Sequence, residues 1–131
     1  AKLKVLFNAN VLKGNSKTII ATSKTSDITK KEKLKKMGVQ VIEVLEKNGM
    51  LNLKELLVKL GKCGIASIMV EGGQTVANSF LKEKLVDKIM FFFCPIIING
   101  CPKIKKAIKL KKVSLTKVGG DFLFESPIAD H

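Results

Sequence analysis

The sequence of 131 residues contains no Arg, no Tyr and no Trp. Arg makes most bidentate contacts to bases and phosphates, and Tyr and Trp provide surfaces on which bases stack. We therefore expect no nucleic-acid partner, although the net charge is +13. A lysine-rich module that binds nucleic acid without catalysis is kept as an alternative, and it predicts salt-dependent binding to any duplex. The dense lysine runs at residues 30–36 and 103–112 are interpreted as solvated surface.

Histidine is nearly absent, and the cysteines are not paired in motifs. The only His is the last residue, His131, and Cys63, Cys94 and Cys101 show no C-x-x-C spacing. Without an internal His, no Ser–His or Cys–His pair is available for nucleophilic catalysis. A zinc site is not expected either, and the odd number of cysteines indicates reduced, packed thiols. The sequence thus assigns no catalytic residue and no metal.

Long apolar runs are missing as well. None approaches the length of a membrane span, and the charged start at residues 1–4 is not followed by the apolar core of a signal peptide. Hydrophobic residues make up 46% of the chain, enough for one core. The sequence predicts a single domain over residues 1–131 of a cytoplasmic protein, with no membrane partner.

The most informative stretch is an apolar run followed by a carboxylate and two glycines. Residues 65–70 are predicted to form a central strand buried on both faces, with Glu71 at its C-terminal edge. Gly72 and Gly73 then lead into a helical pattern. The start of a helix carries free N–H groups, and glycines there let a phosphate approach the backbone. The alternative is that these glycines only form a turn.

The remaining pattern alternates strands with helices. A capping box at Thr29 predicts a short helix that Gly38 ends, and Asn52 caps a second helix with a leucine stripe. This order predicts an α/β fold with a mostly parallel mixed sheet, helices on both faces and a C-terminal antiparallel hairpin. The loop expected at residues 46–50 separates strand and helix. The other strands are expected at residues 3–7, 18–22, 39–44 and 89–93, and the hairpin at residues 111–118 and 121–125.

Four short motifs together resemble a known family, the C-terminal reductase domain of bacterial and archaeal riboflavin biosynthesis proteins. This is the 5-amino-6-(5-phosphoribosylamino)uracil reductase family. It has the dihydrofolate-reductase-like fold and uses NADPH to open the ribose of a phosphorylated pyrimidine to a ribityl chain. The resemblance covers nearly the whole chain and implies an NADPH-dependent oxidoreductase that forms a homodimer. The motifs are Val70-Glu71-Gly72-Gly73, Leu85-Val86-Asp87, Pro95 and Asn99-Gly100.

The resemblance also implies site residues. Glu71 matches the substrate-contacting glutamate of the family, and Ala9 stands where the family has a cofactor-binding serine, so Ala9 offers only its backbone. We expect Thr75 to contact the phosphate because it lies in the first helical turn, whereas Asn78 and Ser79 could form a polar helix face. The cofactor-binding segment comprises Gly72, Gly73, Gln74, Thr75, Val76, Ala77, Asn78 and Ser79.

Several departures from the family affect the interpretation. The family domain begins before Ala1, so we expect this chain to be the C-terminal part of a longer domain. Lys88 replaces an acidic residue, and the zinc motifs of the partner deaminase domain are absent. Reduction of another pterin or of a small carbonyl compound stays open as an alternative. A lysine near Thr22-Ser23-Lys24 would suit an adenosine 2′-phosphate.

Overall fold

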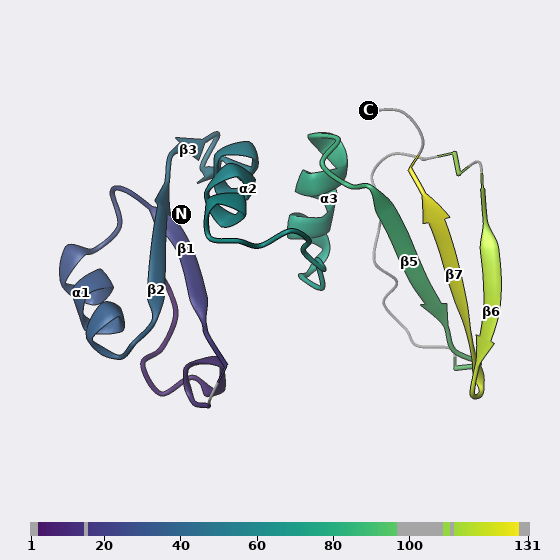
Figure 1. Ribbon diagram of the computed structural model, residues 1–131, viewed down its shortest axis with the longest axis horizontal. Coiled ribbons are helices and arrows are strands. Elements are labelled where there is room, and N and C mark those ends of the chain that lie inside the picture. The colour runs from purple at the N-terminus through teal and green to yellow at the C-terminus, as the bar shows by residue number, and fades with distance from the viewer. Residues whose placement is uncertain (1–2, 15, 97–108, 111, 129–131) are drawn as a thin grey trace. The chain divides into compact units, whose positions relative to one another are not determined.

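The computed structural model describes residues 3–14, 16–96, 109–110 and 112–128 (Figure 1). Its contacts divide the chain into two compact units, Ala1–Ile68 and Met69–His131. The expected turn at Asn99-Gly100, Cys101, His131 and most of the lysine run at residues 103–112 lie outside the described residues. The single-domain expectation stays a prediction.

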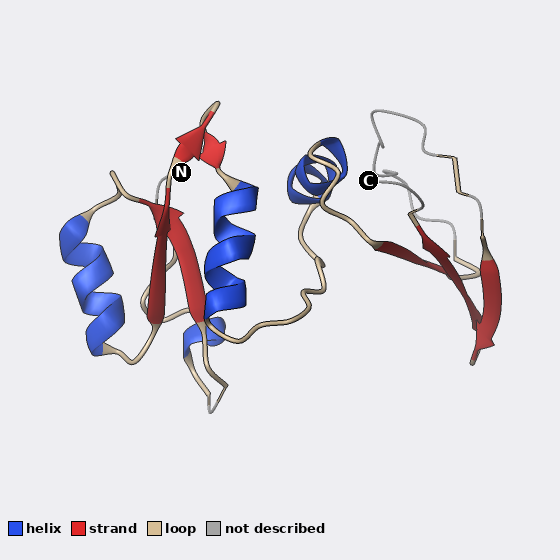
Figure 2. Ribbon diagram, turned by 45° about the horizontal axis from the view of Figure 1, so that its top comes forward, coloured by secondary structure: helices blue, strands red, loops and turns tan. Residues whose placement is uncertain are grey.

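The first unit is built around a short parallel sheet between two helices. Strands β1 and β2 pair in parallel, with Ile19 opposite Gln40. Helices α1 and α2 flank this sheet (Figure 2). The strands expected at residues 18–22 and 39–44 are thus confirmed. The elements are η1 (Asn10–Leu12), β1 (Ile19–Ser23), α1 (Ile28–Lys36), β2 (Gln40–Val44), β3 (Glu46–Lys47), β4 (Met50–Leu51) and α2 (Leu53–Lys62).

Both helices of this unit begin at a side-chain cap. In α2 the Asn52 side chain accepts a hydrogen bond from the Glu55 N–H, as predicted. In α1 the cap is Asp27, whose carboxylate accepts from the Lys30 N–H at 3.0 Å, so the expected cap at Thr29 is wrong by two residues. A carboxylate is at least as good a cap as a threonine hydroxyl. Gly38, at φ +80°, follows α1 and ends it as expected.

Two segments of the first unit differ from the prediction. Residues 3–7 form no strand; their side chains alternate in burial, as in an extended chain, but no described strand pairs with them. Residues 46–51, expected to be mainly a loop, form the small hairpin of β3 and β4. Asn48 and Gly49 both have positive φ, which is the conformation of a two-residue hairpin turn.

The core of the first unit lies between α1 and β2. Leu34 and Val44 are completely buried, and Val39 and Ile42 are nearly so. Leu34 lies on the face of α1 that meets the sheet, where its burial stabilises the helix by tertiary packing. The leucine stripe of α2 is half-buried.

The second unit contains one helix and an antiparallel sheet in the order β5-β7-β6. Phe124 of β7 lies between Phe91 and Leu115 of its two neighbours, and the predicted hairpin is confirmed. Because Gly119-Gly120 connects β6 to β7 by a tight turn, those strands can only be antiparallel. These are the antiparallel strands that the sequence predicts for the C-terminal part of a mixed sheet. Its elements are α3 (Gln74–Lys82), β5 (Lys88–Phe93), β6 (Ser114–Val118) and β7 (Asp121–Pro127).

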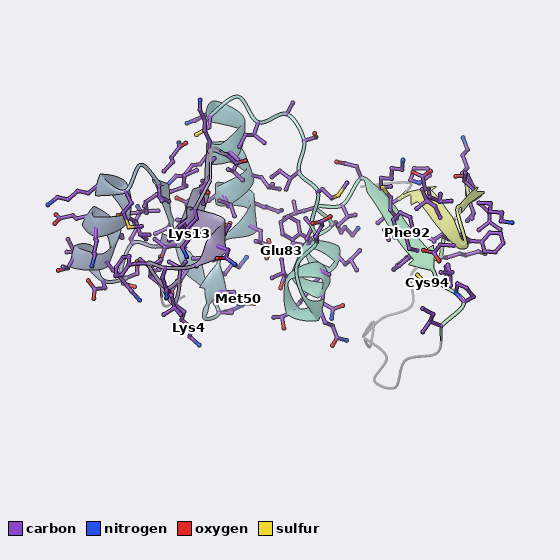
Figure 3. The ribbon with its side chains drawn as sticks, turned by 90° about the horizontal axis from the view of Figure 1, so that it is seen from below. Lys4, Lys13, Met50, Glu83, Phe92 and Cys94 are labelled. Carbon is purple, nitrogen blue, oxygen red and sulfur yellow. The ribbon has the colours of Figure 1, made fainter. Side chains whose placement is uncertain are left out.

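The two apolar runs expected to be buried strands are exposed. Residues 65–70 have no regular structure, and Met69 is 72% exposed. A strand is held by ladder bonds, and no described strand pairs with this segment. Residues 88–93 do form β5, but Phe92 remains 59% exposed (Figure 3). Apolar composition alone therefore predicted burial wrongly at both places.

Candidate functional site

The start of α3, in the second unit, presents the backbone N–H groups of a first helical turn. Gly73 is its N-cap, with φ −57° and ψ 168°, and it supplies no side-chain cap. The first turn also contains no acidic residue. The first N–H groups of any helix have no acceptor within the helix, and the helix dipole adds partial positive charge there. An anion can therefore be bound at this end, whereas α1 and α2 use Asp27 and Asn52.

The two glycines before α3 differ in what surrounds them. A Cβ built on Gly72 would lie 3.1 Å from the Val76 Cβ, so a side chain at Gly72 would crowd the helix. A Cβ built on Gly73 would meet no atom within 4 Å among the described residues. The space beside Gly73 is therefore open to a ligand, and this chain does not need glycine there for packing.

Within the predicted cofactor-binding segment, some N–H groups are used by hydrogen bonds of the helix and others are not. The N–H groups of Val76 and Ala77 both donate to the Gly73 carbonyl, at 2.9 and 3.3 Å, so they serve the helix itself. Thr75 is exposed in the first turn, while Asn78 is half-buried one turn later. The Ser79 hydroxyl donates to the Thr75 carbonyl at 2.8 Å, as serines in helices often do. Phe80, further along α3, is buried.

Glu71 lies two residues before the cap of α3, in the irregular stretch rather than at a strand end. Its side chain is exposed, and within the described ranges it makes no hydrogen bond or ion pair. It is therefore not a carboxylate that merely accepts backbone N–H groups. A carboxylate without a partner, two residues before the cap of a helix, can contact a polar substrate.

Ala9 belongs to the first unit, where it is the N-cap of η1. Its N–H donates to the Leu6 carbonyl at 3.1 Å, and its carbonyl accepts from the Leu12 N–H at 3.0 Å. Both backbone groups of Ala9 are thus already used by the chain. Its expected role as a cofactor contact stays a prediction.

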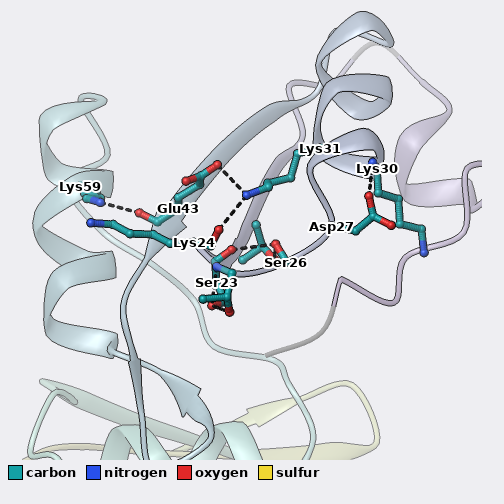
Figure 4. Close-up of polar contacts among 10 residues, drawn as sticks. Ser23, Lys24, Ser26, Asp27, Lys30, Lys31, Glu43 and Lys59 are labelled. Atoms are coloured by element: carbon teal, nitrogen blue, oxygen red, sulfur yellow. Dashed lines mark hydrogen bonds and ion pairs between the residues drawn. The ribbon is translucent and has the colours of Figure 1, made fainter.

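A polar network that the sequence did not reveal joins α1 to β2 in the first unit (Figure 4). Lys31 is only 4% exposed; its Nζ donates to the Lys24 carbonyl at 3.0 Å and lies 3.0 Å from Glu43 Oε1. The hydrogen bond from Lys31 lowers the pKa of Glu43 from its usual 4.5. Solvated surface is therefore the wrong interpretation for Lys31. Lys31 lies three residues before the apolar Leu34 and therefore on the same helix face, and this spacing could have indicated its burial.

Lys59 joins α2 to the same strand. Its Nζ donates to the Glu43 carbonyl and pairs with Glu55 Oε1 at 2.8 Å. Glu55 in turn accepts from the Leu45 N–H at 2.8 Å. The bonds from Lys59 and Leu45 lower the pKa of the Glu55 carboxyl. Strand β2 is thus fastened to a helix on each side.

Among the described residues, no helix has both the length and the hydrophobicity needed to cross a membrane. This finding concerns helices alone.

Comparison with known proteins gives a family. A family model described as the RibD C-terminal domain matches residues 1–124. The riboflavin biosynthesis protein RibD of Aquifex aeolicus (strain VF5) is 36% identical over 131 aligned positions, which cover 93% of this chain and 35% of that protein. The 2,5-diamino-6-ribosylamino-4(3H)-pyrimidinone 5′-phosphate reductase of the same organism is 37% identical over 99 positions, 73% of this chain and 42% of that protein. The chain thus spans less than half the length of these curated relatives.

Two solved structures give the fold. Acinetobacter baumannii RibD, form 2, superposes with a TM-score of 0.71 at 20% identity, over 95% of this chain and 35% of that one. The Saccharomyces cerevisiae riboflavin biosynthesis reductase Rib7 superposes with a TM-score of 0.66 at 19% identity, over 87% of this chain and 70% of that one. The expected dihydrofolate-reductase-like α/β fold is confirmed.

Proposed function

The chain belongs to the RibD C-terminal domain family, and on this premise we propose that it carries an NADPH-dependent reductase activity of riboflavin biosynthesis. The proposed substrate is 5-amino-6-(5-phosphoribosylamino)uracil, and the product is the corresponding ribitylamino compound. Family membership supports the reaction class. The residues at the start of α3 support the cofactor.

The observation that carries the proposal is the uncapped start of α3. Gly73 has no side-chain cap and open space at its Cβ position, and the first turn contains no acidic side chain. The N–H donors, in a first turn without acidic side chains, fit the diphosphate of a dinucleotide. Gly73, Gln74 and Thr75 would hold it, while Val76 and Ala77 supply the helix behind them. Asn78 and Ser79, one turn further, would reach only a flanking part of the ligand.

The chain's own contribution to the reaction is orientation. When bound, the reduced nicotinamide supplies the hydride that the substrate ribose accepts at C1. The exposed Glu71 carboxylate would bind a polar group of the pyrimidine or ribose and hold C1 at the required distance. In the chain, only Gly72 separates Glu71 from the N-cap Gly73.

A second possible substrate is 2,5-diamino-6-ribosylamino-4(3H)-pyrimidinone 5′-phosphate, the compound in the name of one relative. The two relatives from Aquifex aeolicus are 36% and 37% identical to this chain, and only one of them is named as a diaminopyrimidinone phosphate reductase. Both compounds are phosphorylated ribosylamino-pyrimidines, and they differ at one ring substituent. Parallel assays with both compounds, at equal NADPH concentration, would decide between them by the ratio of kcat/KM.

We also propose a homodimer that works in the cytoplasm without nucleic-acid or membrane partners. Strand β6 pairs only with β7 among the described strands, so its other edge can pair with a second copy across a two-fold axis. Sedimentation of the chain would test this. A monomer at micromolar concentration contradicts the dimer but leaves the reductase proposal standing.

The deciding experiment is a titration with NADPH, monitored by calorimetry and nucleotide fluorescence, together with amide hydrogen exchange of the free and the saturated protein. It should be made on this chain and on a form extended toward the N-terminus. We expect saturable binding in at least the longer form, with NADH binding more weakly. If neither form binds NADPH, or if NADPH protects amides other than those at the start of α3, the proposed cofactor site is wrong.

A further inference from the structure

The first unit contains a basic hollow of about 450 Å³ at the outer edge of β2. Its lysines come from three separate elements: Lys24 follows β1, Lys35 lies in the last turn of α1, and Lys59 and Lys62 lie in α2. The hollow has no residue in common with the start of α3. Its lining consists of Lys24, Lys35, Val41, Ile42, Glu43, Lys59, Lys62 and Cys63.

The edge of β2 offers this hollow backbone donors. The Gln40 N–H donates to Thr18 and the Val44 carbonyl accepts from Lys24, so the even-numbered residues of β2 face β1. In a parallel ladder the alternate residues face the other side. The N–H groups of Val41 and Glu43 therefore lie on the free edge. The Glu43 carbonyl on that edge is already occupied by Lys59.

The charges in the hollow are only partly compensated. Glu43 is paired with Lys31, and the Lys59 ammonium is paired with Glu55. Across the described residues, the ammonium groups of Lys24, Lys35 and Lys62 have no hydrogen-bond or ion-pair partner. Three lysines without a direct partner thus lie around backbone N–H donors, and the Glu43 carboxylate attracts Lys24 and Lys35 at longer range. Figure 4 shows the Lys24 and Lys59 side chains on the α2 side of β2.

Lysines at a sheet edge commonly serve to keep other strands away. That role explains charge at the edge, but it does not require lysines from the loop after β1, from α1 and from α2 to line one hollow. An added strand would need alternating donors and acceptors along β2, and Lys59 already occupies the Glu43 carbonyl. The edge therefore favours an anion, which needs donors alone.

We propose that this hollow binds a phosphate or diphosphate group of a small molecule, a site that goes beyond the proposed reductase activity. The ammonium groups of Lys24, Lys35 and Lys62 hold the anion, and the Val41 and Glu43 N–H groups fix its position against the strand. The phosphate belongs either to a free metabolite or to the 2′-position of an adenosine; in the second case the site rests on the proposed function, because NADPH carries that phosphate. Inorganic pyrophosphate and adenosine 2′,5′-bisphosphate separate these sources, because only the second compound carries the nucleoside.

The test is a titration of the isotope-labelled chain with inorganic pyrophosphate at physiological ionic strength, monitored by amide resonances. The site variant carries Lys24→Gln, Lys35→Gln and Lys62→Gln. The matched control carries Lys17→Gln, Lys36→Gln and Lys54→Gln, which remove the same charge from exposed lysines of the same unit. We expect saturable shifts at Val41 and Glu43 and about a tenfold higher Kd in the site variant. The control should change Kd by about threefold or less, because distant charges are screened.

Equal weakening in both triple variants would overturn the site, since it would show attraction to the overall charge only. Shifts confined to amides outside β2 would overturn it as well. If the triple variant fails to fold, Lys35→Gln alone, set against Lys36→Gln, makes the same comparison on α1. Tighter binding of adenosine 2′,5′-bisphosphate than of pyrophosphate assigns the site to a nucleotide, and the reverse order assigns it to a free metabolite.

Discussion

Lys31 Nζ and Glu43 Oε1 lie 3.0 Å apart, with the lysine almost fully buried between α1 and β2. The same ammonium donates to the Lys24 carbonyl, so one side chain connects a helix, a strand and the loop after β1. Glu43 is half-buried and on its backbone side receives Lys59 from α2. This pair therefore joins α1 to β2, and its Glu43 also lines the basic hollow.

Removing the lysine should destabilise the first unit. In Lys31→Met the Glu43 carboxylate and the Lys24 carbonyl both lose their donor, and we expect a loss of about 1–3 kcal/mol in the free energy of unfolding. Urea unfolding followed by circular dichroism measures it. Lys33→Met, at an exposed position of the same helix, is the control. Equal stability of the two variants would mean that the buried pair contributes nothing.

Stability should fall in acid because of two carboxylates. The pKa values of Glu43 and Glu55 are lowered by hydrogen bonds from Lys31 and Lys59. A carboxyl with a lowered pKa in the folded state contributes stability above its ordinary pKa of about 4.3, and this is lost as the pH falls through the folded value. We expect the free energy of unfolding to decrease below about pH 4.3. In Glu43→Gln the decrease should be smaller than in the wild type; an unchanged acid limb contradicts the prediction.

Gly72 and Gly73 should respond differently to alanine. At Gly73 the backbone suits alanine and no described atom is within 4 Å, so Gly73→Ala should fold normally but bind NADPH about tenfold more weakly. Gly72→Ala would press a methyl group against Val76, at 3.1 Å, and should cost about 1 kcal/mol of stability. Thermal unfolding and nucleotide titration of both variants separate the two effects. Unchanged NADPH affinity in Gly73→Ala would remove the diphosphate from the start of α3.

Glu71 should affect turnover rather than cofactor affinity. Because its exposed carboxylate has no partner among the described residues, Glu71→Gln should fold with unchanged stability. We expect kcat/KM to fall by about tenfold or more, while the Kd for NADPH stays within about twofold. Steady-state kinetics on the form that turns over gives kcat/KM, and a nucleotide titration gives the Kd. Glu83→Gln, in the same unit, is the charge-matched control; wild-type turnover in Glu71→Gln would exclude Glu71 from the site.

The cap of α1 can be tested directly. Asp27→Ala removes the acceptor of the Lys30 N–H and should cost about 1 kcal/mol, whereas Thr29→Ala should cost little. The two urea midpoints compare the positions. A larger loss at Thr29 would restore the capping box expected from sequence spacing.

Local patterns determined the elements that depend on neighbouring residues. The leucine stripe after Asn52, the helix after Gly73 and the hairpin around Gly119 all form where the sequence predicted them. The motif around Glu71 led to the correct family, and with it the fold. These features rest on side-chain spacing, caps and turns, which act over a few residues.

The tertiary structure decided everything that depends on partners far away in the chain. Residues 65–70 are as apolar as a buried strand, yet no described strand pairs with them. Lys31 lies in a lysine run that predicts solvated surface, yet the position of β2 buries it beside Glu43. The lysines of the basic hollow come together only because α1, α2 and the loop after β1 are arranged around one strand edge. Burial and pairing depend on which segments meet, and that information is not contained in the spacing of residues along one segment.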